Sequence, residues 1–309
     1  MRTRSLSLIS LITSMVIFGT VGIFRKYIDL PSSLLAMARG LIGFLFLLAV
    51  LLFKKQKPDR AAIRKNAVLL LLSGIFIGFN WILLFEAYRY TTIATATLCY
   101  YMAPILVILA APILFKEKMT VKKLVCVLSA LCGITLVSGI FDSTESSATN
   151  TTGILLGLGA AALYASVILM NKKISGIGAL DKTLVQLGSA GVVMIPYFFL
   201  TEDVTAISYD TTSILFLLIV AIVHTGIAYT MYFGSIASLP AQTVAIFSYI
   251  DPVVAIILSA IIFHEQLTPA GIIGAILILG TALIEELPIG RKKEKIQAQN
   301  AQNSIDKQP

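Results

Sequence analysis

The chain has 309 residues, of which 57% are hydrophobic and only 13% are charged, and this composition excludes an ordinary soluble domain. Soluble domains carry about 25% charged residues, and a chain of this length could not hide so much apolar surface from water in one core. The net charge of +8 raises nucleic-acid binding as an alternative, which the positions of the basic residues then argue against.

Ten apolar segments follow one another along the chain, and a helix needs roughly 20 such residues to cross the hydrocarbon core of a bilayer. They lie near 5–24, 32–53, 66–88, 92–115, 121–140, 153–171, 183–200, 213–234, 241–263 and 269–287. They lack the period-two alternation of a membrane β-barrel strand, and backbone groups in lipid must be satisfied within each segment. The predicted fold class is therefore all-α integral membrane, with ten transmembrane helices.

The basic residues are distributed unevenly between the two predicted sides of the membrane. Of the 24 lysines and arginines, 20 fall at the N-terminus, around the loops after the second, fourth and sixth spans, and in the C-terminal tail. An excess of Lys and Arg marks the cytoplasmic side. We therefore expect a multi-pass protein of the inner (plasma) membrane with both termini cytoplasmic. The partner of its basic residues is then the lipid bilayer and not nucleic acid.

A polar segment without Lys or Arg, residues 141–152, separates five spans from five. We interpret it as an outer linker between a first five-helix repeat, residues 1–140, and a second, residues 153–287. The polar end of the chain, residues 288–309, is predicted to be a disordered cytoplasmic tail.

The two halves resemble each other in sequence. When residues 85–120 are shifted by 148 positions without a gap, nine residues fall on identical ones, and Tyr101 and Pro104 fall on Tyr249 and Pro252. Each half has an odd number of spans, so the second half must enter the membrane from the opposite side. The sequence therefore predicts two inverted repeats, an arrangement that carriers use to build a site between the halves.

The segments YYMAPILVILAAPILFKEKMT and SYIDPVVAIILSAIIFHEQLT resemble the paired fourth and ninth helices of the drug/metabolite transporter superfamily, EamA type. The second span, which contains ARGLIG, also fits, and the resemblance covers residues 5–287. It implies a carrier of five plus five helices, in a family whose members mostly export amino acids, metabolites or toxic compounds. Small multidrug carriers of the superfamily use a glutamate in the first helix, and this first span has no acid, so that mechanism does not carry over.

Asp251 is the first candidate for a functional residue, because it lies near the middle of the ninth span, directly before Pro252. Ionisable groups within a membrane cost about 2.5–3.5 kcal/mol each on the insertion scale, so they suggest function. Asp251 could carry a proton or bind an amine on the solute. It could equally be a protonated acid that hydrogen-bonds the backbone freed by the proline; both interpretations stand.

Three further ionisable residues lie within predicted spans. Arg39 could bind a carboxylate or phosphate, but a structural role, by pairing with Glu86 or by extending its stem toward the interface, is favoured. Glu86 and Arg89 are spaced for a local ion pair, and Glu86 is a secondary candidate for proton coupling. His224 could relay protons or contact the solute, although a lone histidine bonded to a carbonyl is the commoner outcome.

Aromatic and amide side chains near the centres of their spans suggest a lined cavity, because membrane Trp and Tyr otherwise gather at the interfaces. The set is Asn80, Trp81, Tyr100, Tyr101, Tyr164, Tyr229, Tyr232 and Tyr249. Packing with a hydroxyl–carbonyl bond is the alternative role of these tyrosines. Glu265, at the end of the ninth span, is expected to cap or pair with the next helix.

The sequence therefore favours a secondary-active transporter, and more narrowly an exporter, of a small metabolite such as an amino acid or an aromatic or cationic compound. We expect it to work by alternating access at a midplane site between the repeats, without cofactor or metal. The alternatives are an intramembrane enzyme, although GxSxG, GxGD and HExxH are all absent, and a membrane scaffold. The substrate, the direction of flux, the coupling ion and whether the chain forms a homodimer are left open.

Overall fold

The computed structural model describes residues 2–115, 119–137, 147–236, 239, 247–265 and 267–286, and within these residues it contains helices and no strand. The helices before the second half are α1 (Arg2–Gly19), α2 (Val21–Lys26), α3 (Ser32–Phe53), α4 (Arg60–Lys65), α5 (Ala67–Tyr90), α6 (Ile93–Tyr100), α7 (Ala103–Phe115) and α8 (Val121–Val137). Those that follow are α9 (Ser147–Lys173), α10 (Ala179–Thr201), α11 (Thr211–Ile219), the π-helix η1 (Val220–Ile227), α12 (Ala228–Ile236), α14 (Ile250–Ile262) and α15 (Pro269–Glu286). The all-helical membrane fold class is thereby confirmed.

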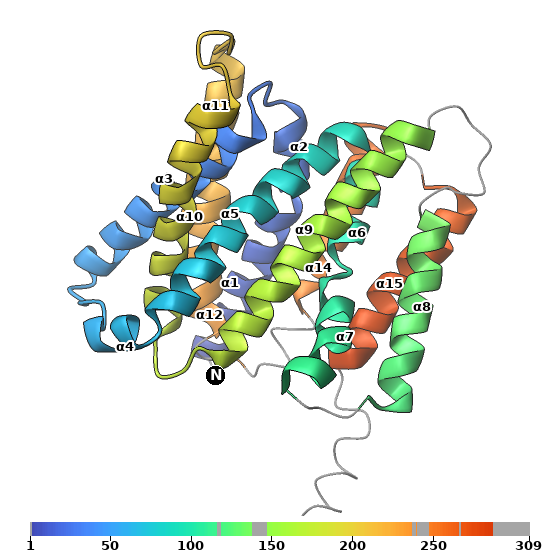
Figure 1. Cartoon of the computed structure of the whole chain (residues 1–309), viewed down its shortest axis with the longest axis horizontal. Coiled ribbons are helices and arrows are strands. Elements are labelled where there is room, and N and C mark those ends of the chain that lie inside the picture. The colour runs from blue at the N-terminus through green and yellow to red at the C-terminus, as the bar shows by residue number, and fades with distance from the viewer. Residues whose placement is uncertain are drawn as a thin grey trace, which may run out of the picture.

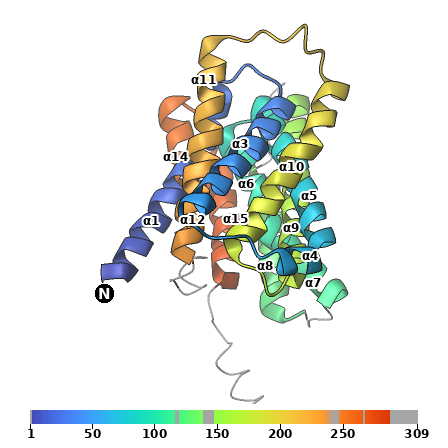
Figure 2. The ribbon, with the colours of Figure 1, turned by 90° about the vertical axis from the view of Figure 1, so that its left-hand side faces the viewer.

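Among the described residues, seven helical stretches are long and apolar enough to cross a membrane: Ser5–Lys26, Ser32–Phe53, Ala67–Tyr90, Ile93–Leu114, Asn150–Lys173, Ala179–Thr201 and Thr211–Tyr232. Two shorter apolar helices, Ile250–Ile262 and Pro269–Thr281, fall in the ninth and tenth predicted segments, and α8 falls in the fifth. The helices lie side by side in one bundle (Figure 1). The end of the bundle that carries the N-terminus and α4 is called the α4 end below, and the opposite end, which carries the connection from α10 to α11, is called the α11 end (Figure 2).

The predicted linker differs from the structure in part. Helix α9 begins at Ser147, so the last six residues of the predicted linker, 147–152, are helical. Residues 141–146 and the predicted tail, 288–309, lie outside the described residues.

The fourth span is interrupted, and α14 begins at the corresponding place in the second half. Helix α6 ends at Tyr100 and α7 begins at Ala103, with a turn at Tyr101 that precedes Pro104. Helix α14 likewise begins directly after a turn at Tyr249 and holds Pro252 in its first turn. Proline fits the first turn of a helix and disfavours helical backbone before it, so the repeated Tyr-x-x-Pro places a helix start at the same depth in each half.

The helix contacts exchange between the halves under the 148-residue shift. Helix α5 packs on α9, and α12, its counterpart, packs on α1, the counterpart of α9. Helix α3 packs on its own counterpart α10, and α8 packs on α15. Each half therefore contacts the other through related helix pairs.

Helices α3 and α10 cross at backbone contact. A Cβ atom added to Gly40 would lie 2.5 Å from both the Cα and the amide nitrogen of Gly191. Only residues without side chains permit this approach, so the two halves are held together at the centre by direct packing of their backbones.

Candidate functional site

A cavity of about 540 Å³ lies between the two halves. Its wall includes side chains of α1, α3, α5 and α6 from the first half and of α9, α10, α12 and α14 from the second. The wall extends to Asn171 and Lys182, which lie where α9 ends and α10 begins, at the α4 end. The cavity therefore runs from the middle of the bundle toward the α4 end.

The structure places all eight members of the predicted aromatic and amide set on this wall. Tyr100 stacks on Tyr164 with ring centroids 5.3 Å apart, and Tyr101 lies 6.2 Å from its repeat counterpart Tyr249. Asn80, also on the wall, donates a hydrogen bond of 2.6 Å to the carbonyl of Ala160. Each of these contacts joins the first half to the second, so the cavity wall is also the interface between the halves.

Asp251 lies on the wall at the start of α14, where the helix follows the Tyr249 turn. The Tyr101 hydroxyl donates a hydrogen bond of 3.0 Å to its Oδ2 atom. No basic side chain of the described residues lies within ion-pair distance of this carboxyl group. The turns at Tyr101 and Tyr249, one in each half, thus meet at one acid that borders the cavity.

Arg39 reaches the wall from α3, and its side chain is almost wholly buried. Its Nε donates a hydrogen bond of 2.9 Å to the Thr225 hydroxyl, and its guanidinium carbon lies 4.3 Å from the ring centroid of Trp81. The pairing with Glu86, one of the two structural roles considered for Arg39, is wrong. Glu86 lies near the end of α5 and pairs with Arg25 and Arg89 instead.

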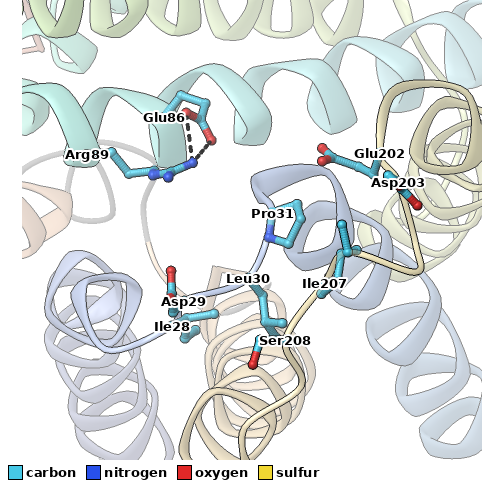
Figure 3. A pocket seen from close by; sticks show the side chains of 11 residues that line it. Ile28, Asp29, Leu30, Pro31, Glu86, Arg89, Glu202, Asp203, Ile207 and Ser208 are labelled. Carbon is cyan, nitrogen blue, oxygen red and sulfur yellow. Dashed lines mark hydrogen bonds and ion pairs between the residues drawn. The ribbon is translucent and has the colours of Figure 1, made fainter.

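Glu86 borders a second pocket, of about 460 Å³, at the α11 end (Figure 3). Its carboxylate lies 3.3 Å from the Arg89 guanidinium, so the predicted local ion pair is confirmed, and it accepts a 2.5 Å hydrogen bond from Ser32. Asp203 lies on the same pocket, and hydrogen bonds from the Thr205 hydroxyl and backbone hold the pKa of this carboxyl below its ordinary value. The structure therefore places Glu86 away from the central cavity.

His224 does not line the central cavity, in contrast to its expected contact with the solute. It lies in the π-helix η1, where its Nε2 atom is 2.8 Å from the Thr20 hydroxyl and its ring packs against Phe24. Each turn of a π-helix holds an extra residue, so the faces of the helix shift relative to an α-helix. In this arrangement the neighbouring Thr225, and not His224, contacts Arg39.

Thr183 and Gln186 of α10 also line the cavity, although no motif of the sequence marked them. The Gln186 amide donates hydrogen bonds to Ser73 at 2.7 Å and to Asn171 at 2.8 Å, and thereby joins α10 to α5 and α9. The signal that could have found Gln186 and Asn171 is the one used for Asn80, an amide within an apolar span.

The α11 end is fastened by Glu265, which follows α14. Its carboxylate accepts a 2.8 Å hydrogen bond from the backbone N–H of Ile93, the first residue of α6, and lies 3.7 Å from Lys26. The first N–H groups of a helix have no partner within the helix, and the helix dipole favours an acid there. The sequence predicted that Glu265 would cap or pair with the next helix. In the structure it caps α6, a helix of the other half.

Substitutions of Glu265 are expected to lower the stability of the fold, and more so when the hydrogen bond to Ile93 is lost together with the ion pair to Lys26. Glu265→Gln keeps a hydrogen-bond acceptor for Ile93 and loses a partly exposed ion pair, worth about 0–1 kcal/mol. Glu265→Ala also leaves the Ile93 N–H unsatisfied, at about 1–3 kcal/mol. In thermal unfolding of the purified proteins, the melting temperature should be highest for wild type, lower for Glu265→Gln and lowest for Glu265→Ala. Equal melting temperatures of the two variants would contradict the capping role of Glu265.

Comparison with known proteins gives the family of the chain. The model of the EamA-like transporter family matches twice, over residues 5–139 and 151–284. An uncharacterized transporter of Bacillus subtilis (strain 168), YxxF, is 30% identical over 262 residues, which are 84% of this chain and 83% of the relative. An uncharacterized transporter of Archaeoglobus fulgidus is 26% identical over 89% of this chain and 94% of its own length.

A solved crystal structure resembles the fold with a TM-score of 0.62 at 18% sequence identity, and the match covers 94% of this chain and 99% of that one. The apolar helices, the cavity between the halves and the double match of the family model agree with one another. The chain is a multi-pass membrane transporter and belongs to the EamA-like transporter family.

Proposed function

We propose that this chain is a secondary-active carrier that exports a small metabolite, such as an amino acid or an aromatic or cationic compound, by alternating access. The observation that carries the proposal is the central cavity, whose wall is built by both halves around the turns at Tyr101 and Tyr249. Interrupted helices at corresponding places in two repeats are typical of carrier binding sites.

The two ends of the bundle differ, and the difference supports one state of an alternating-access cycle, in which the cavity opens toward the α4 end and is closed at the α11 end. The cavity wall extends to Lys182 at the α4 end, whereas Glu265 ties α14 to α6 and α2 at the α11 end. By the distribution of basic residues, the α4 end faces the cytoplasm of a cell whose inner membrane holds the protein. The exchange of helix contacts between the halves supports a second state, in which the opposite end opens.

Asp251 is the proposed coupling group. It borders the cavity and lacks an ionic partner among the described residues, so a proton or an amine on the solute can meet its charge. The Tyr101 hydroxyl bridges it to the first half, so a change in the charge of Asp251 acts directly on a contact between the halves.

Liposomes containing the purified full-length protein test this function. We expect saturable uptake of one chemical class from a panel of labelled amino acids, amines, nucleosides and sugars, with no flux in protein-free liposomes. Chemical conversion of a labelled compound would favour an enzyme, and an absence of saturable flux across the panel would contradict a carrier of these metabolites. In cells, export predicts that expression lowers the accumulation of the same compound.

A further inference from the structure

Arg39 is a buried cation that has no anionic partner among the described residues. Its exposed fraction is 5%, and the ion pairs of the described residues join Arg25 and Arg89 to Glu86 and Lys26 to Glu265. An unpaired charge within a membrane is unfavourable, and such groups almost always face a partner, water or a transported ligand. The protein therefore retains, at the centre of the bundle, a positive charge that no described acid neutralises.

The geometry of the guanidinium group indicates where its partner would bind. Nε is occupied by the Thr225 hydroxyl, and one face of the group lies over Trp81 and near Phe85. The two terminal nitrogens have no hydrogen-bond partner in the part of the chain that the structure describes, and Arg39 borders the cavity. Two parallel N–H donors on the edge of a guanidinium match the two oxygens of a carboxylate.

The π-helix gives this arrangement its rigidity. Thr225 lies in η1, and its hydroxyl also contacts the carbonyl of Val220, five residues earlier, at 3.4 Å. With Nε held by Thr225 and the plane held by Trp81, the orientation of the guanidinium is set before any ligand binds. A preorganised group loses less freedom on binding, which favours specific recognition.

We propose that Arg39 is the anion subsite of the central cavity and that its terminal nitrogens bind a carboxylate of the transported solute. This rests on the proposed function and narrows it, because a simple cation would leave Arg39 unpaired. Arg39 and Lys182 are the basic residues on this wall, and Lys182 lies at the α4 end. One guanidinium at the centre of the bundle matches one negative charge, which favours a monocarboxylate over a phosphate dianion. Asp251 borders the same cavity without pairing with Arg39, so a zwitterion could meet each group at one end.

The chain contains a built-in reporter for this subsite. Trp81 is the only tryptophan of the 309 residues, and its ring centroid lies 4.3 Å from the guanidinium carbon of Arg39. A ligand that binds Arg39 must come close to this ring, so the emission of Trp81 measures occupancy without knowledge of the natural solute.

The experiment titrates the purified full-length protein in lipid nanodiscs with three probes that share a phenylethyl group: 3-phenylpropionate, phenethylamine and 2-phenylethanol. Acetate serves as a small carboxylate without the ring. We expect 3-phenylpropionate to change Trp81 emission saturably and at lower concentrations than 2-phenylethanol does. A response to phenethylamine, whose amine can meet Asp251, should not be weakened by Arg39→Gln. Arg39→Gln should weaken the carboxylate response about tenfold or more, because charge-assisted hydrogen bonds are lost. Arg39→Lys, which keeps the charge but not the paired donors, should fall between the two. Arg64→Gln, at an exposed arginine of α4, is the matched control and should respond as wild type.

Either of two results would contradict the anion subsite. One is that neither 3-phenylpropionate nor acetate changes Trp81 emission up to its solubility limit; the other is that wild type and Arg39→Gln respond equally to the carboxylates. Should Arg39→Gln fail to fold, Arg39→Lys and Thr225→Val provide the comparison, and a wild-type response from both would be equally contrary. Flux in liposomes separates this proposal from the carrier itself. Carboxylate binding without flux would support the anion subsite and contradict the carrier function. Flux that Arg39→Gln does not change would support the carrier function and contradict the anion subsite.

Discussion

Replacing Asp251 with asparagine is expected to abolish the accumulation of solute driven by a pH gradient while passive exchange of solute continues. Asparagine has nearly the same shape and can still accept the hydrogen bond from Tyr101, which is 3.0 Å long in the wild type. It cannot gain or lose a proton, so the link between proton movement and solute movement is broken. Liposomes with an imposed pH gradient, and the same liposomes without it, measure the two activities.

The control for this variant is Asp210→Asn. Asp210 caps α11 by accepting a hydrogen bond of 2.9 Å from the Ser213 backbone, and asparagine is an equally good cap. This variant should accumulate solute as wild type does. If Asp251→Asn also kept its accumulation and pH dependence, Asp251 would be a structural acid that only hydrogen-bonds its neighbours.

Gly40→Ala is expected to destabilise the protein, with a free-energy loss of about 1–3 kcal/mol or more. The added methyl group would meet backbone atoms of Gly191 at 2.5 Å, and backbone atoms cannot rotate aside as a side chain can. Helices α3 and α10 must then separate, which also moves Arg39, the neighbour of Gly40, away from Trp81 and Thr225. Thermal unfolding of the detergent-purified protein measures the loss of stability.

Gly280→Ala is the matched control, since it makes the same substitution in helix α15. A Cβ atom at this position meets no atom of the described part of the chain within 4 Å, so the change should be neutral or stabilise the helix by up to about 1 kcal/mol. Equal melting of Gly40→Ala and Gly280→Ala would contradict the close backbone packing at the centre of the bundle.

Hydropathy predicted where the chain is helical, because the requirement that backbone groups be satisfied in lipid leaves few alternatives. The breaks at Tyr101 and Tyr249 follow from prolines that the sequence shows. The shift of η1 to π-helix does not, because one extra residue in a turn changes which side chains share a face without changing the hydropathy. His224 was misplaced relative to the cavity for this reason.

Residues of the cavity wall can be found from the sequence where polar or aromatic side chains stand near the centres of apolar spans. Such groups are unfavourable in lipid and therefore turn inward, as Asn80 and Tyr229 do. The same rule applied to Gln186 would have added it to the site. The partner of Arg39 could not be predicted, because pairing with Glu86 depends on the relative height of α3 and α5, and the sequence does not specify that height.

The most direct test of alternating access is exchange across the membrane of liposomes that contain the purified protein. Liposomes preloaded with unlabelled solute are compared with empty ones for uptake of the labelled compound. After releasing labelled solute inside, a carrier with one central site turns back to the outer face faster when unlabelled solute occupies the site. We therefore predict faster initial uptake into preloaded liposomes, and uptake that saturates with the solute concentration on either side. Uptake that is independent of the internal solute and does not saturate would contradict a cavity that opens to one side at a time.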